Sequence, residues 1–231
     1  GIKDKRPIYI PSNCESNIAV FGPPASGKTA GLAIINAMHF GGSVLAVDIK
    51  GDIYNYVSAH SSRKIIRFCP DDPNAIDISC HFDPLNGIQN MNSTDRKLYI
   101  DEMSTILIPD EGGTDGNFFT NRARKYFQGI VHLLLYKDPD TSFPDIIHAI
   151  LEEDAFIWVT EARSSECVEA KELLSSFYGS NEKNVSGAYD TLCSALTPFS
   201  NSILDELLSK SDNCISIESP ENGYDGYLQI A

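Results

Sequence analysis

IAVFGPPASGKTAGLAIINAMHFGGSVLAVD, residues 18–48, is the stretch of sequence that decides the expected fold. Residues 18–21 are a short apolar run of the kind that forms a buried parallel strand, and residues 43–48 are a second one. Apolar residues at helical spacing lie between the two runs. Because KIIRF at 64–68 follows as a third apolar run, we predict an α/β fold with a parallel sheet.

The loop between the first strand and the helix carries the strongest motif. GPPASGKT matches G-x-x-x-x-G-K-[ST], whose backbone N–H groups cradle phosphates. Lys28 supplies a charge for the β- and γ-phosphates, and the Thr29 hydroxyl supplies a ligand for Mg²⁺. We therefore expect ATP and Mg²⁺ as cofactors, with Lys28 and Thr29 as the catalytic pair. The expected nucleotide-binding residues of the loop are Gly22, Pro23, Pro24, Ala25, Ser26, Gly27, Lys28 and Thr29.

The pattern changes near residue 90. Between residues 93 and 210 apolar residues recur at three- and four-residue spacing, which predicts helices. Ser142 followed by Asp145 is typical of a helix N-terminus. Strand-like sequence returns in CISIES at 214–219 and YLQI at 227–230. We expect a first part of a nucleotide-binding domain at 1–90, an inserted all-alpha domain at 91–212, and a return to the first domain at 213–231.

A phosphate loop needs a second carboxylate that holds the water shell of Mg²⁺. Three candidates are Asp48 at the end of its apolar run, the pair Asp101 and Glu102 in LYIDE, and Glu161 in FIWVTE. The sequence favours none of the three, and we expect this acid, with an arginine finger, beyond Ala231. An alternative is an ATPase of the AAA+ type with Asp101 and Glu102 as the Walker B acids, which requires LYIDE to be a strand.

The charge of the chain is unevenly distributed. Residues 1–137 hold 14 basic and 14 acidic residues, whereas residues 138–231 hold 4 basic and 18 acidic ones. This excess argues against the second part lying along a nucleic-acid backbone. The acidic excess of residues 138–231 indicates either a solvated helical surface or a docking face for a basic partner.

Composition excludes several other classes of protein. With 231 residues, of which 42% are hydrophobic and 22% charged, the chain is neither a disordered tail nor a disulfide-stapled miniprotein. No apolar run approaches the roughly 18 residues of a membrane span, and we expect no secretory leader. The six cysteines form no C-x-x-C pair, so we expect neither a zinc site nor disulfides. Dispersed thiols of this kind fit a protein of the reducing cytoplasm.

Taken together, the motifs resemble those of the type IV coupling proteins, the TraG/TraD-like ATPases of conjugation and type IV secretion. GSVLAVDIKGDIYNYVS at 42–58 is similar to the family's G-S-V-x-x-x-D-P-K-G-[ED]-[LI]-Y. FCPDDP and HFDPLNGI are similar to its F-x-P and N-P-L signatures. NFFTNRARKYFQGIVHLLLY resembles the stretch that opens its all-alpha domain, and SGAYDTLCSALTPFSN resembles a later helical segment.

The resemblance implies a RecA-like P-loop sheet, present in part, with an inserted all-alpha domain. It also implies a hexameric, ATP-driven motor on the cytoplasmic side of the bacterial inner membrane, attached through segments absent from this chain. Its expected partners are other subunits, other secretion components, and a DNA–relaxase complex or a secreted effector or adaptor at the acidic all-alpha domain. Without the Walker B acid, this chain is expected to bind nucleotide but hardly to hydrolyse it.

Further site residues follow from the resemblance. Asp48, Lys50 and Asp52 match its D-x-K-G-[ED] loop and are expected near the nucleotide, with Asp48 reaching Mg²⁺ through water. A solvated turn is the alternative for these three residues. Arg122 and Arg124 are expected on the surface or between subunits. Ile49 and Asp83 depart from the family's proline and asparagine, and a non-enzymatic acidic adaptor platform for secretion cargo remains an alternative function.

Overall fold

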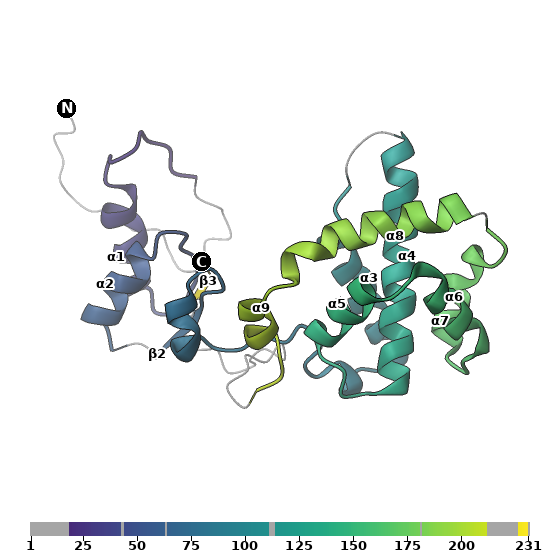
Figure 1. Ribbon diagram of the computed structural model, residues 1–231. Coiled ribbons are helices and arrows are strands. Elements are labelled where there is room, and N and C mark those ends of the chain that lie inside the picture. The colour runs from purple at the N-terminus through teal and green to yellow at the C-terminus, as the bar shows by residue number, and fades with distance from the viewer. Residues whose placement is uncertain are drawn as a thin grey trace.

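The structure, a computed structural model, describes residues 19–42, 44–62, 64–110, 114–180, 182–211 and 226–230. Figure 1 shows two parts, a small one that holds all the described strands and a larger one built of helices alone. The segment around 64–92 leads from the small part to the large one.

The small part consists of a few short elements. Its helical elements are the π-helical turn η1 (Thr29–Ala33), α1 (Ile34–His39) and α2 (Asp52–His60). Its strands are β1 (Val44–Val47), β2 (Lys64–Phe68) and β3 (Gly226–Ile230). The strands pair in the parallel sense in the order β1-β3-β2, with Val44 opposite Tyr227 and Lys64 opposite Gly226. The last described segment of the chain therefore lies between two early strands.

One face of β1 packs on the helices and the other is exposed. Val44 and Ala46 are half-buried against a small core centred on Ala37 of α1 and Val57 of α2. Leu45 and Val47 alternate with them and are 66% and 68% exposed. This alternation follows from the two-residue period of a strand.

The prediction of an α/β fold with a RecA-like parallel sheet is wrong. The described chain is predominantly helical, and its strands have only four or five residues each. Residues 19–21 of the first predicted strand are not in a strand, and Phe21 is 93% exposed. An apolar run forms a strand only where a neighbouring strand supplies backbone partners, and the described pairings give this run none. The runs at 44–47, 64–68 and 227–230 are strands as predicted, whereas 214–219 lies outside the described residues.

The large part confirms the prediction of helices between residues 93 and 210. It follows the short turns η2 (Pro73–Ile78) and η3 (Ile88–Asn90). Its longer helices are α3 (Ser93–Leu107), α4 (Thr114–Lys137), α5 (Phe143–Glu152), α6 (Ala155–Ser164), α7 (Val168–Leu174) and α8 (Glu182–Leu196). Shorter pieces are η4 (Ser175–Phe177), η5 (Thr197–Phe199) and α9 (Ser202–Leu207).

Helix α4 is the axis of the large part. Its buried face includes Tyr126, Phe127 and Ile130, each 0% exposed, and α3, α5, α6, α7 and α8 all contact it. The Tyr126 ring meets Phe177 edge-on at 4.5 Å between ring centroids, and its hydroxyl donates to the Ala155 carbonyl. The helices around α4 thus share a single hydrophobic core.

The ends of the surrounding helices are set by side-chain caps. Ser142 and Asp145 form a reciprocal capping box at the start of α5, as the sequence predicts. Asn92, Asp154 and Asn201 accept from the first-turn amides of α3, α6 and α9. Each such cap contributes about 1 kcal/mol to helix stability.

Asp83 ties the connecting segment to the large part. Its side chain is 0% exposed, and Oδ1 accepts from the Leu85 amide at 2.8 Å and the Phe143 amide at 3.3 Å. The second bond joins the connecting segment to the first residue of α5, 60 positions along the chain. Burial raises the pKa of the Asp83 carboxyl above its usual value because the charged form is poorly solvated there.

The raised pKa predicts a pH-dependent effect of Asp83→Asn. The native state prefers the protonated acid, so the contribution of Asp83 is greatest at acid pH and is lost as the pH rises through its raised pKa. An asparagine stays neutral, so we expect Asp83→Asn to gain stability relative to the wild type as the pH rises from 4 to 7, by on the order of 1 kcal/mol. Urea unfolding at both pH values measures the difference. Asp77→Asn, at an exposed carboxylate of η2, is the control, and an equal pH profile for both variants would contradict the account.

Candidate functional site

The predicted phosphate loop lies on the surface of the small part. Residues 22–27 are exposed and lead directly into the helical turn η1, as a phosphate loop requires. Figure 1 shows this purple segment rising away from the helices of the large part. The first-turn amides of a helix have no intrahelical acceptor, so they remain available to an anion.

Two residues give the loop its shape. Gly27 has φ +84° and Ala25 has φ +59°, both in the left-handed region. A Cβ at Gly22 would lie 2.8 Å from Ser26 Oγ, so only glycine fits at that position without a shift. The loop closes through a hydrogen bond from the Ser26 amide to the Pro23 carbonyl at 3.3 Å. The backbone therefore forms a tight turn, and a side chain at residue 22 would require the Ser26 hydroxyl to move.

Lys28 folds back over this turn. Its ammonium donates to the Gly22 carbonyl at 2.6 Å and the Pro23 carbonyl at 2.9 Å. Both bonds are exposed, so an anion can compete for the ammonium at little cost. The residues present thus fit a bound phosphate. Gly22 and Gly27 lie in the tight turn, η1 begins directly after it, and the Lys28 ammonium lies against the turn.

Asp48 has a structural task that the sequence analysis missed. It is 5% exposed, and its Oδ2 accepts from the amides of Ile53 and Tyr54, both at 2.9 Å. These amides belong to the first turn of α2, so the carboxylate caps that helix. Gly51 makes the intervening turn possible with φ +70°. The sequence does indicate this capping role, because Asp48 comes shortly before Gly51 and the amphipathic helix α2.

Lys50 and Asp52 are exposed at the same turn. Helix α2 contacts η1, so the turn at 48–52 and the end of the phosphate loop belong to neighbouring elements. The structure thereby brings the two predicted binding segments into one small lobe.

The other carboxylate candidates lie on helices of the large part. Asp101 and Glu102 are on α3, where Asp101 Oδ1 accepts from Gln128 Nε2 at 2.7 Å. The AAA+ alternative requires a strand at this position, so that alternative is wrong. Glu161 is on α6 and pairs with Lys137 of α4.

Arg122 and Arg124 both fold against the large part. The Arg124 side chain is only 15% exposed, because it donates to the Ile108 carbonyl at 2.9 Å and pairs with Asp110 at 3.0 Å. Arg122 stacks its guanidinium 4.2 Å from the centre of the Phe177 ring. Both arginines are therefore partly buried, and a position between subunits stays a prediction. The sequence did not indicate the stacking of Arg122 on Phe177.

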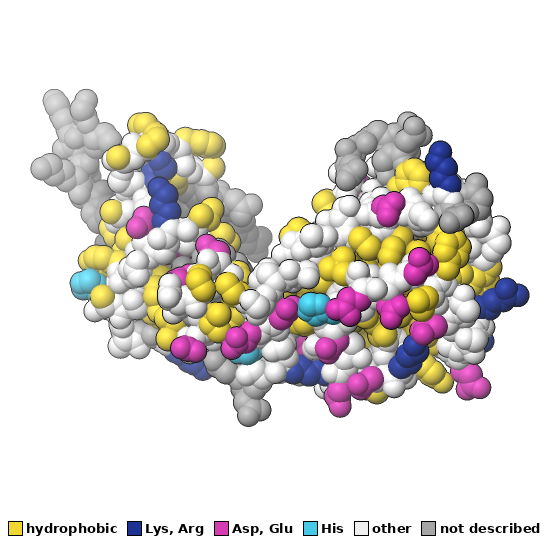
Figure 2. Space-filling view, viewed as in Figure 1, with side chains coloured by type: hydrophobic (Ala, Val, Ile, Leu, Met, Phe, Trp, Pro, Cys, Tyr) yellow, Lys and Arg dark blue, Asp and Glu magenta, His cyan; other side chains and the backbone are white. Residues whose placement is uncertain are grey.

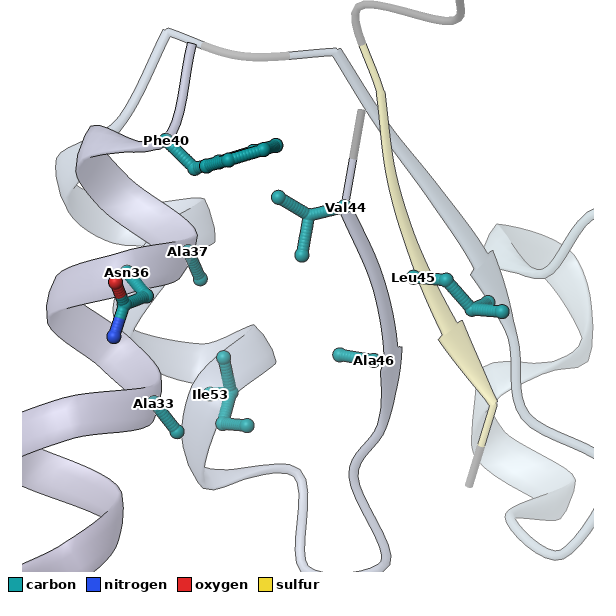
Figure 3. Close-up of a pocket in the computed structure, with 8 residues that line it drawn as sticks. All are labelled: Ala33, Asn36, Ala37, Phe40, Val44, Leu45, Ala46 and Ile53. Carbon is teal, nitrogen blue, oxygen red and sulfur yellow. The ribbon is translucent and has the colours of Figure 1, made fainter. Parts of the chain in front are cut away.

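A cavity of about 370 Å³ lies between α1 and β1. Figure 3 shows Val44 and Ala46 pointing from β1 toward α1, while Leu45 points away. None of the described residues that line it is charged. Its apolar lining suits packing rather than phosphate binding.

Within the described ranges, no three His, Cys, Asp or Glu side chains are grouped as a metal site. Among the helices that the structure describes, none is both long and apolar enough to cross a membrane.

The chain belongs to the family of type IV secretory system conjugative DNA transfer proteins, whose model matches residues 4–216. This match confirms the resemblance to type IV coupling proteins. One curated relative is the conjugal transfer protein TraG of Escherichia coli, 20% identical over 152 residues. The match covers 64% of this chain and 23% of that protein, so the chain spans about a quarter of the length of this relative.

The capping role of Asp48 predicts a stability defect for Asp48→Ala. Loss of the two amide bonds should lower the free energy of unfolding by roughly 1–2 kcal/mol and speed amide exchange in α2. Asp52→Ala removes an exposed acid in the first turn of the same helix, and its loss should cost less, roughly 0.3–1 kcal/mol. Hydrogen exchange over residues 52–60 and thermal unfolding measure both. Equal losses in the two variants would show that Asp48 is not the cap.

Proposed function

We propose that the chain is the nucleotide-binding part of a type IV coupling protein. ATP with Mg²⁺ would bind at residues 22–29, and the whole protein would use ATP hydrolysis to recruit and translocate DNA or protein. The main observation behind this proposal is the exposed loop, in which Gly27 has φ +84° and the Lys28 ammonium lies against the Gly22 carbonyl. The family match supports the same conclusion from the sequence as a whole.

Within this proposal each loop residue has a task. The amides at the start of η1 bind phosphate oxygens, and Lys28 leaves the Gly22 and Pro23 carbonyls to neutralise phosphate charge. The Thr29 hydroxyl serves as a ligand for Mg²⁺. Bound ATP supplies the free energy of its hydrolysis. Lys50 and Asp52 lie exposed at the neighbouring turn and are available to the same nucleotide.

Asp48 enters the proposal with two tasks. Its Oδ2 holds the start of α2, and a carboxylate so fixed keeps its other oxygen in a defined place. We also expect Asp48 to reach Mg²⁺ through a water molecule, as its match to the family's D-x-K-G-[ED] loop implies. Asp48 would therefore couple metal binding to the position of α2.

Partners of the whole protein are proposed from the family. We expect subunits to assemble as a hexameric ring at the inner membrane together with other secretion components. The relative's printed name, conjugal transfer protein, is consistent with a DNA–relaxase complex as cargo.

A receptor role for the large part is favoured by its charge. Figure 2 shows acidic side chains scattered over the visible face of the helical part. The acidic residues of α5 and α6 include Asp145, Glu152 and Glu161. Such a surface suits a basic region of a relaxase, effector or adaptor, and it accords with the acidic excess of residues 138–231.

Nucleotide binding by the 231-residue chain tests the proposal. Titration of a fluorescent ATP analogue with Mg²⁺ should give saturable binding, and Lys28→Ala should weaken it roughly tenfold or more because a charged hydrogen bond to phosphate is lost. Lys64→Ala, at an exposed lysine of the same lobe, should leave the affinity unchanged. Absence of binding by the wild type, or equal affinities for all three proteins, would contradict the proposal.

A further inference from the structure

A second cavity, of about 450 Å³, opens on the large part between α3, α4 and α7. Helix α4 contributes Lys125, Gln128 and His132, whose spacing puts them on one face of the helix. The flanking helices both contact α4. These polar residues lie beside the apolar face that α4 buries in the core.

His132 is the unusual residue of this cavity. It is 8% exposed, and among the described residues its ring has no hydrogen-bond partner. Burial lowers the pKa of the imidazole to about 4, so the ring is neutral at pH 7 and offers one donor and one acceptor. Because His132 lines the cavity, its acceptor nitrogen can receive a hydrogen bond from a ligand there.

The charged groups around the cavity are incompletely matched. Glu169 and Glu172 of α7 share Lys97 of α3, at the long distances of 3.9 and 4.0 Å. Exposed pairs of this length contribute little and open easily. Lys125 lies exposed at the rim, and Asp101 is a third lining carboxylate. Three carboxylates therefore face two lysines, and the neutral His132 adds no positive charge.

We propose that this cavity binds a guanidinium group on an alkyl stem. Glu169 and Glu172 lie three residues apart on one helix face, where two carboxylates can receive the planar fork of N–H donors. The His132 lone pair and the Gln128 carbonyl oxygen accept the remaining donors. Leu98 and Leu173 line the cavity and pack against the alkyl stem.

Binding would release Lys97 from its two long ion pairs into solvent. An anion is a poorer occupant, since it would meet three carboxylates as well as the two lysines. The guanidinium can come from a free small molecule or from an arginine side chain of a partner protein, and the probes below separate these sources. The inference is independent of the nucleotide proposal, because the cavity and the phosphate loop lie in different parts of the fold.

The test is a titration of the 231-residue chain followed by the NMR signals of the His132 ring. Agmatine stands for a free guanidinium compound, N-acetyl-arginine amide for an arginine of a partner, and inorganic phosphate for an anion. We expect saturable shifts with the guanidinium probes, and roughly tenfold weaker binding in the Glu169→Gln/Glu172→Gln variant. Glu166→Gln, at an exposed acid just before α7, is the matched control and should bind as the wild type does.

The outcomes decide both the site and the source. Tighter binding of agmatine supports a small molecule, and tighter binding of the arginine amide supports a partner protein. Equal affinity in the double variant and the wild type would overturn the proposal, as would shifts caused by phosphate alone. Circular dichroism checks that the double variant folds, and the two single variants replace it if it does not.

Discussion

The close approach of α7 to α4 is the constraint on which the large part depends. A Cβ at Gly129 would lie 2.6 Å from Leu174 Cγ, so the two helices can meet only where α4 lacks a side chain. Likewise, a Cβ at Gly187 of α8 would lie 2.7 Å from Cε1 of Phe119 in α4. Since interiors are packed as densely as crystals, these contacts fix how the helices lie around the axis.

This packing has consequences for both candidate sites. The face of α4 that carries Gln128 and His132 borders a cavity because α3 and α7 flank it at set distances. The phosphate loop, by contrast, lies on a small lobe in which the described residues form a core centred on Ala37 and Val57. The loop is held mainly by bonds within itself and is free to adapt to a ligand.

Local features of the sequence predicted local features of the structure. The helical spacing between 93 and 210, the capping box at Ser142 and the strands β1 and β2 follow from neighbouring residues, and the structure has them. The prediction of a RecA-like sheet was wrong because strand pairing joins segments that are distant in the sequence. The residues around position 20 do not reveal whether a distant strand will pair with them. The functions of the loop residues stay predictions.

The roles of single charged residues were the hardest to predict. Asp48 caps α2 by accepting from amides five and six residues away. The motif suggested a ligand-binding role for Asp48 and gave no sign of this capping role. Arg122 faces Phe177, 55 positions along the chain, and only the folded chain brings them together. The spacing of Lys125, Gln128 and His132 is visible in the sequence, but the cavity that they line forms only where α3 and α7 flank α4.

The most direct measurement of the central claim compares Gly129→Ala with Gly31→Ala by chemical unfolding. At Gly31 a Cβ would meet nothing within 4 Å, so alanine there should be neutral or stabilising by up to about 1 kcal/mol. At Gly129 the clash with Leu174 should cost roughly 1–3 kcal/mol despite the better helix propensity of alanine. Equal stability of the two variants would contradict the account of α4 as a closely packed axis.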